Sequence, residues 1–215
     1  MSSRPPYHSR RALLGGMAAL TFSRNAWAAG GAPVITMLGD SITAGYGLRA
    51  QDALPAQLQI ALARLGVRTT VRGAGVSGDT SAGGLGRVDF SVQPDTALCI
   101  VALGGNDLLQ GLNPKSTRAN LEAIVRRLKA RRIGVLLCGL SAPYRLNAGF
   151  ARDFNTLFPA VARAEDVPLY PDLLAGVELR RDLNQGDGIH PNPRGVKIIA
   201  ARMAPVVARA LGRRT

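Results

Sequence analysis

Short apolar runs that alternate with segments of helical periodicity constrain the fold of this chain more than any other feature. Runs of strand length cover residues 34–38, 67–72, 96–103, 133–140 and 167–170. Apolar side chains recur every three or four positions over 54–65, from Pro114 to Leu128, over 150–158 and over 194–211. Apolar strands connected through amphipathic helices form a parallel sheet that is covered on both faces. We therefore expect an α/β fold, a three-layer α/β/α sandwich around a central five-stranded parallel sheet.

The composition is that of one globular domain with a sizeable core. The chain has 215 residues, of which 47% are hydrophobic, and a formal net charge of +13. Nucleic-acid binding is one interpretation of this charge, but the basic residues are scattered and no nucleic-acid-binding motif accompanies them. We interpret the charge as a solvated basic surface, and we expect a monomer without a nucleic-acid partner.

The first 28 residues have the pattern of an export signal. Residues 1–11 are basic, residues 12–22 form an apolar run too short to cross a membrane, and Ala26-Trp27-Ala28 is a typical cleavage site. The Arg10-Arg11 pair and the Ala-Leu-Leu that follows it resemble the twin-arginine export signal. We expect a signal peptide over 1–28, a single domain over 29–215, and a periplasmic or secreted location reached by the twin-arginine route.

Ser41 stands where the first apolar run ends, directly after Gly39 and Asp40. A serine in this position can present its hydroxyl and its backbone N–H to the same space, so that one residue supplies an attacking oxygen and an oxyanion donor. Alternatively, Ser41 is simply the N-cap of the following segment. The stretch is not the G-x-S-x-G elbow of α/β-hydrolases, because Thr43 replaces the second glycine.

Three further polar clusters are found at residues 75–79, 104–107 and 187–191, and the first two follow apolar strands. Ligands bind at the carboxyl ends of parallel strands, so these clusters mark a candidate site. His190 is the only histidine outside the expected signal peptide. Asp187 can accept a bond from one nitrogen of this imidazole, which leaves the other nitrogen for Ser41. Taken alone, this segment can equally be a surface turn.

Together the four clusters resemble the four sequence blocks of the SGNH/GDSL hydrolase superfamily. The blocks are Gly39-Asp40-Ser41, the turn at Gly78, Gly104-Gly105-Asn106-Asp107, and Asp187-x-x-His190, in this order. The strings SGDTSAGGLGRV, LGGND and DGIHPN are most similar to the bacterial periplasmic branch of thioesterases, arylesterases and lysophospholipases. One departure is Gly73, where that branch commonly has asparagine. The resemblance implies a flavodoxin-like sheet, which is the SGNH hydrolase fold.

The resemblance also implies a role for each candidate residue. Ser41 is the nucleophile, His190 is the general base and then the acid, and Asp187 orients the imidazole. The oxyanion hole consists of the N–H groups of Ser41 and Gly78 and the side-chain amide of Asn106. These residue types suit the roles, because glycine permits close backbone approach and an amide donates without titrating. No cofactor is implied.

The implied reaction is the hydrolysis of carboxylic esters and thioesters through an acyl-enzyme intermediate, with aryl esters, acyl thioesters and lysophospholipids as substrates. One alternative is a carbohydrate acetylesterase of the same fold, for which Tyr144 is the obvious sugar platform. Another is a non-catalytic lipid- or carbohydrate-binding module, but a module has no use for Ser41, Asp187 and His190 together.

The loops after the active-site strands contain apolar residues that can form a wall for an acyl chain. They are Leu108, Leu109, Leu112, Leu146, Phe150, Leu173 and Leu174, within the segments 108–113, 141–150 and 174–185 or beside them. The alternative is that these side chains only pack the loops onto the core. Nearby arginines favour an anionic substrate or belong to the basic surface; they are Arg145, Arg152, Arg180 and Arg181.

Two other kinds of site are not expected. Residues 73–78 fit the G-x-G-x-x-G dinucleotide fingerprint, but they follow the second strand and no acidic residue sits at a strand end about 20 residues on. A metal site is not expected, because Cys99 and Cys138 lack ligand spacing and only one histidine is available. Both cysteines lie in apolar runs, so we expect buried free thiols. Among the acids near the site, Asp79 and Asp107 are expected to cap helices or turns and Asp40 to be structural.

Overall fold

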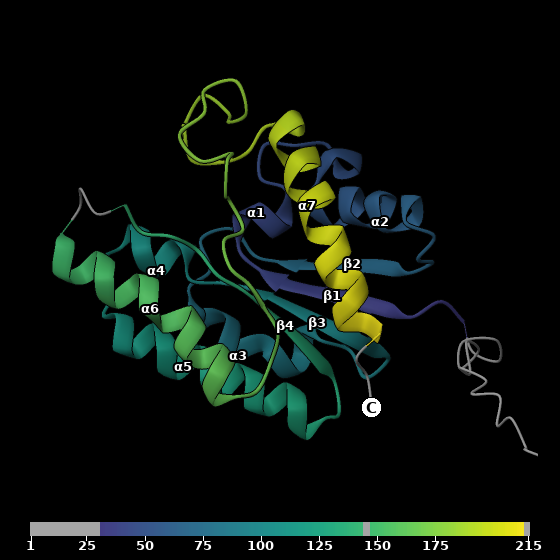
Figure 1. Cartoon of the computed structure of the whole chain (residues 1–215), viewed down its shortest axis with the longest axis horizontal. Coiled ribbons are helices and arrows are strands. Elements are labelled where there is room, and N and C mark those ends of the chain that lie inside the picture. Colours follow the sequence, from purple (N-terminus) through teal and green to yellow (C-terminus); the bar gives the residue numbers. More distant parts are fainter. Residues whose placement is uncertain (1–30, 144–146, 213–215) are drawn as a thin grey trace, which may run out of the picture. The chain divides into compact units, whose positions relative to one another are not determined.

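The computed structural model describes residues 31–143 and 147–212, in which a five-stranded sheet lies between two layers of helices (Figure 1). The strands are β1 (Val34–Gly39), β2 (Thr70–Gly75), β3 (Thr96–Ala102), β4 (Gly134–Cys138) and β5 (Leu169–Tyr170). Their order is β2-β1-β3-β4-β5, and every neighbouring pair is parallel. This is the flavodoxin-like order, so the expected fold class is confirmed.

The helices divide between the two faces of the sheet (Figure 1). One face carries α1 (Ser41–Ala44), α2 (Leu54–Arg64) and α7 (Pro193–Gly212). A 3-10 helix at Ala50–Asp52 lies between α1 and α2 in the chain. The other carries α3 (Ser81–Ser91), α4 (Gly105–Leu109), α5 (Pro114–Ala130) and α6 (Ala148–Ala164). All seven residues of β3 are buried, as expected for a central strand covered on both faces. The apolar stripe predicted for α5 is also buried; it consists of Leu121, Ile124, Val125 and Leu128.

Two features of this fold differ from the sequence prediction. Helices α3 and α4 were not expected, and α3 contains Gly83, Gly84 and Gly86, which obscure any helical periodicity. Strand β2 begins three residues later than predicted and includes two glycines. The reason is close packing, since a Cβ at Gly75 would lie 2.3 Å from the backbone nitrogen of Ala44.

The two cysteines are buried free thiols, as predicted. Cys99 on β3 is paired in register with Val135 on β4, three residues before Cys138. Burial raises the pKa of the Cys99 thiol to about 12, and it raises the pKa of Cys138 as well. Both side chains are therefore core residues that stay protonated at physiological pH.

Several predictions fall on residues that the structure does not describe. They are the export signal over 1–28, the acyl-wall residue Leu146, and the loop residues Tyr144 and Arg145. Within the described ranges, no helix combines the length and the apolar character that a membrane crossing requires.

Candidate active site

The candidate residues gather where the strand order reverses, between β1 and β3. Ser41 follows β1, Asn106 follows β3, and Gly78 lies in the turn after β2. The fourth cluster, with Asp187 and His190, precedes α7. In open parallel sheets, ligands bind at this kind of switch point, beyond the carboxyl ends of the strands.

Ser41 is the first residue of α1 and not its N-cap. The cap is Asp40, whose Oδ1 accepts the N–H of Ile42 at 3.1 Å. The alternative interpretation of Ser41 as a cap is therefore wrong, and its hydroxyl is free for another contact.

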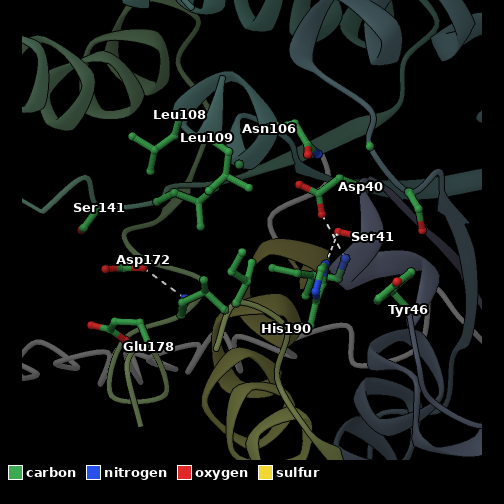
Figure 2. Close-up of a pocket in the computed structure, with 17 residues that line it drawn as sticks. Asp40, Ser41, Tyr46, Asn106, Leu108, Leu109, Ser141, Asp172, Glu178 and His190 are labelled. Atoms are coloured by element: carbon green, nitrogen blue, oxygen red, sulfur yellow. Dashed lines mark hydrogen bonds between the residues drawn. The ribbon is translucent and has the colours of Figure 1, made fainter. Parts of the chain in front are cut away.

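That contact is with His190, whose ring lies beside Ser41 (Figure 2). The same ring also contacts Asp187. Its Nε2 is 2.8 Å from Oγ of Ser41, and its Nδ1 is 2.6 Å from Oδ2 of Asp187. With Nδ1 protonated toward the carboxylate, Nε2 can accept the hydroxyl proton. The structure thus brings together the three residues that the sequence singled out, in the geometry of a nucleophile, a base and an orienting acid.

The carboxylate of Asp187 is held in its charged form. Its Oδ1 accepts the backbone N–H groups of Ile189 at 2.9 Å and of His190 at 3.0 Å. These bonds, led by the one from the backbone of His190, and the contact with the imidazole lower the pKa of Asp187 to about 2. A permanent negative charge beside Nδ1 stabilises an imidazolium when His190 takes up a proton.

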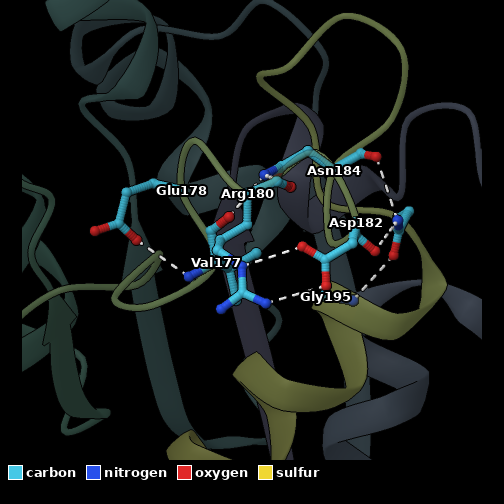
Figure 3. A network of polar contacts seen from close by, with 7 residues as sticks. Val177, Glu178, Arg180, Asp182, Asn184 and Gly195 are labelled. Carbon is cyan, nitrogen blue, oxygen red and sulfur yellow. Dashed lines mark hydrogen bonds and ion pairs between the residues drawn. The ribbon is translucent and has the colours of Figure 1, made fainter.

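Two side-chain amides hold the ends of the loop that contains Asp187 and His190, and Figure 3 shows one of them, Asn184. Asn184 forms a bridge with Pro191, and its Nδ2 donates to the carbonyls of Val177 at 2.6 Å and Arg180 at 2.9 Å. Asn192 accepts the N–H groups of Arg194 and Gly195, which caps α7. The loop is therefore anchored at both ends, which restricts where the imidazole can point.

The three expected oxyanion donors line the same pocket. Gly78 has a φ of 83°, in the left-handed region that glycine adopts without strain. Asn106 donates one hydrogen of its amide to the carbonyl of Asp79 at 2.8 Å, which leaves the second hydrogen for a ligand. An oxyanion bound near Ser41 can thus receive two backbone N–H groups and one amide.

The neighbouring acids have different structural roles. Asp107 is buried and accepts the N–H of Ser81, the first residue of α3, so its expected role as a cap is confirmed. The same expectation for Asp79 is wrong. Its Oδ2 pairs with Nε of Arg87 at 2.7 Å, and Thr80 is the N-cap of α3.

Asp40 is buried beside the nucleophile, and only 4% of its surface is exposed. Burial raises its pKa to about 6, although the N–H of Ile42 and the charge of His190 act in the opposite direction. The carboxylate is therefore ionised at neutral pH, and this ionisation in a buried position costs free energy of folding.

The pocket has a volume of about 270 Å³ and a mostly apolar wall (Figure 2). Its apolar residues are Ile42, Leu108, Leu109, Leu140, Leu174 and Ile189, and Tyr46 lies beside His190 with the ring centroids 4.7 Å apart. Of the predicted wall, Leu108, Leu109 and Leu174 line the pocket. Leu173 is buried in the core, Phe150 stacks on Phe154, and Leu112 is partly exposed outside the lining.

Sequence reasoning missed half of this wall. Leu140 ends the fourth apolar run, and Ile189 directly precedes His190. The positions of these two residues, at a strand end and beside the histidine, could have predicted that they line the pocket. The end of the pocket with Ser141 also has two carboxylates, Asp172 and Glu178 (Figure 2). No lysine or arginine is among the described residues that line the pocket, and Arg180 pairs with Asp182 at 3.1 Å.

Comparison with known proteins identifies the family of the chain. "Esterase TesA" of Pseudomonas aeruginosa is 37% identical over 161 residues, which are 74% of this chain and 80% of the relative. "Thioesterase 1/protease 1/lysophospholipase L1" of Escherichia coli is 36% identical over 177 residues, which are 82% of this chain and 84% of the relative. Among solved structures, AlinE4, a SGNH-hydrolase family esterase, matches with a TM-score of 0.71 and 44% identity over 85% of this chain and 98% of its own. The model of the GDSL-like lipase/acylhydrolase family matches residues 37–198, and the chain therefore belongs to this family.

Proposed function

We propose that the protein is a serine hydrolase that cleaves carboxylic esters and thioesters through an acyl-enzyme intermediate. The observation that supports this most is the pair of contacts at His190, 2.8 Å to Oγ of Ser41 and 2.6 Å to Oδ2 of Asp187. Membership in an acylhydrolase family and relatives named as esterases and thioesterases support the same reaction.

The proposed reaction has two halves. Oγ of Ser41 attacks the acyl carbonyl while Nε2 of His190 takes up the hydroxyl proton, and Asp187 stabilises the imidazolium. The oxyanion accepts hydrogen bonds from the N–H groups of Ser41 and Gly78 and from the amide of Asn106. Collapse of this tetrahedral intermediate forms the acyl-enzyme and releases the alcohol or thiol, which takes the proton from His190. Water then attacks the acyl carbonyl of the acyl-enzyme while His190 takes up its proton. Collapse of this second tetrahedral intermediate releases the carboxylic acid, and His190 returns the proton to Oγ of Ser41.

The proposed substrates carry a short to medium acyl chain, with a neutral end, on a small leaving group. The wall of leucines and isoleucines supports an acyl chain, because each buried methylene contributes about 0.8 kcal/mol. Asp172 and Glu178 make the far end polar and negative, which disfavours an anionic group there. Aryl esters and acyl thioesters fit this description best, and we propose that the protein acts as a monomer.

The test is a series of p-nitrophenyl esters with acyl chains from two to twelve carbons, compared with an acetylated xylo-oligosaccharide. We expect kcat/KM to rise with chain length to a maximum within the series and to exceed that for the sugar. A preference for the acetylated sugar, or no dependence on chain length, would show that the enzyme is instead a carbohydrate acetylesterase or has another substrate class.

We further propose that residues 1–28 are a signal peptide, that 29–215 form the catalytic domain, and that export uses the twin-arginine route. The Arg10-Arg11 pair supports the route. Replacement of both residues by lysine keeps the charge and should leave the precursor in the cytoplasm. Normal export of this variant would instead indicate the general secretory route.

A further inference from the structure

Arg87 on α3 makes an unusual set of contacts at the carboxyl ends of two strands. Its Nη2 donates to the carbonyl of Gly39 on β1 at 2.8 Å, and its Nη1 donates to the carbonyl of Ala74 on β2 at 2.9 Å. Its Nε donates to Oδ2 of Asp79 at 2.7 Å, and Nη1 also contacts Oγ of Ser91 at 3.1 Å. Only 19% of the arginine side chain and 11% of the aspartate side chain are exposed.

Two of these acceptors, Gly39 and Asp79, lie close in sequence to proposed oxyanion donors. Gly39 is two residues before Ser41, and Asp79 directly follows Gly78. Asp79 also reaches the third donor, because its carbonyl accepts the side-chain amide of Asn106 at 2.8 Å. The guanidinium of Arg87 is thus linked to all three proposed oxyanion donors. At most two residues lie between the guanidinium and each donor.

The turn at Gly78 needs such an anchor. A Cβ at this glycine would meet no atom within 4 Å, so side-chain packing does not fix the position of its N–H. Local backbone bonds contribute, since Asp79 donates to the carbonyl of Val76 and Val76 donates to that of Gly39, both at 3.1 Å. The ion pair between Arg87 and Asp79 ties this turn to α3 through a charged side chain.

Arginine is suited to this task because its planar fork presents five N–H donors in fixed directions. Four of its contacts use three nitrogens and reach two strand ends and a turn. A lysine supplies one point charge and cannot hold three acceptors in a fixed relation. Oxyanion stabilisation depends on donors that are already in place before the reaction, so their spacing matters for rate.

We propose that Arg87 is a positioning residue for the oxyanion hole, setting the distances among the N–H groups of Ser41 and Gly78 and the amide of Asn106. Arg87 acts through these groups and is not among the described residues that line the pocket. This inference rests on the proposed function, since an oxyanion hole matters only if Ser41 forms a tetrahedral intermediate.

The test compares Arg87→Met, which keeps the aliphatic stem, and Arg87→Lys, which keeps the charge, with the native enzyme. The matched control is Arg127→Met, because Arg127 joins α5 to α3 at the carbonyl of Leu85 and at Asp89, away from the strand ends. We expect kcat for a p-nitrophenyl ester to fall roughly 10²-fold in Arg87→Met, as for the loss of one oxyanion donor, with KM changed by less than about threefold. Arg87→Lys should recover only part of this loss, and Arg127→Met should leave kcat unchanged.

Two readouts separate positioning from a general loss of structure. A boronic acid that forms a tetrahedral adduct on the nucleophile should bind each Arg87 variant more weakly in proportion to kcat, whereas the carboxylic acid product should bind unchanged. In a double-mutant cycle, Arg87→Met should cost much less in an Asn106→Ala background than in the native one. If Arg87→Met does not fold, the same comparisons are made with Arg87→Lys.

The inference is overturned if folded Arg87 variants keep kcat within threefold of native, if boronate and product binding fall together, or if the cycle is additive. Failure of the proposed function has a different signature. In that case the native enzyme hydrolyses no ester of the series and a fluorophosphonate does not label Ser41, whatever residue stands at position 87.

Discussion

The side-chain amide of Gln185 donates to the backbone carbonyl of Tyr46 at 2.8 Å, which joins the histidine loop to the segment that follows Ser41. The same Nε2 donates to the carbonyl of Pro191 at 3.1 Å, and the backbone N–H of Gln185 donates to the carbonyl of His190. The distance between His190 and Ser41 therefore depends on a residue that belongs to neither the strand ends nor the candidate triad.

We expect Gln185→Ala to lower kcat by about tenfold with little change in KM, because two hydrogen bonds of about 1 kcal/mol each no longer hold the imidazole in place. Steady-state kinetics with a p-nitrophenyl ester measure this. Gln57→Ala is the control, since Gln57 also donates to a backbone carbonyl, that of Gln51, but lies on α2. Equal effects of the two substitutions would refute the role of Gln185.

Asn106→Ala is expected to lower kcat by roughly 10²–10³ with KM nearly unchanged, as for a lost oxyanion donor. The amide contributes to the transition state more than to substrate binding in the proposed mechanism. Asn120→Ala serves for comparison, because the amide of Asn120 donates to Oγ of Ser81 and is outside the pocket lining. A rise in KM at constant kcat would mean that Asn106 binds substrate instead.

The buried carboxyl of Asp40 predicts a pH-dependent stability. Its pKa is about 6 in the fold against an ordinary value of 3.8, so between these values the native state binds a proton that the unfolded state has released. The free energy of unfolding therefore falls by about 3 kcal/mol as pH rises from about 4 to about 6. Above about pH 6, Asp40 causes no further change in stability.

Asp40→Asn removes the charge and keeps an acceptor for the N–H of Ile42. We expect the variant to gain stability over the native protein at pH 8 and to lose most of that gain at pH 4. Urea unfolding at both pH values measures the difference. If the two proteins differ by the same amount at pH 4 and pH 8, the ionisation of Asp40 does not carry the cost that we assign to it.

The carboxylates at the end of the pocket predict discrimination by charge. We expect the native enzyme to hydrolyse p-nitrophenyl hexanoate faster than the equivalent ester with a terminal carboxylate. Asp172→Asn with Glu178→Gln should reduce this preference by about thirtyfold, at about 1 kcal/mol for each partly exposed charge. Both amides keep the oxygen that accepts a backbone N–H, from Leu174 and Val177 respectively.

The control for this prediction is Asp182→Asn, which removes a carboxylate that pairs with Arg180 outside the pocket lining. It should leave the preference as it is in the native enzyme. A preference that persists in the double variant would show that steric fit, and not charge, excludes the carboxylate.

The sequence was informative where local chemistry is sufficient. Apolar runs locate buried strands because their side chains must leave water, and the single available histidine pointed to Ser41 and Asp187. Helix α3 escaped prediction because its glycines remove the periodic signal, and it is held by tertiary contacts such as that of Ser81 with Asp107. The hydrogen bonds of the Arg87 and Gln185 side chains could not be predicted either, because most of their acceptors are backbone carbonyls distant in sequence.

Labelling with a fluorophosphonate, followed by peptide mass spectrometry, tests most directly whether Ser41 is the covalent nucleophile. We expect one adduct per chain, located on Ser41. The adduct should be absent from the Ser41→Ala variant and from native protein that is denatured before exposure to the probe. Labelling should also slow strongly in His190→Ala, because the hydroxyl then lacks its base. An adduct on another residue, or labelling that persists in Ser41→Ala, would show that Ser41 is not the nucleophile.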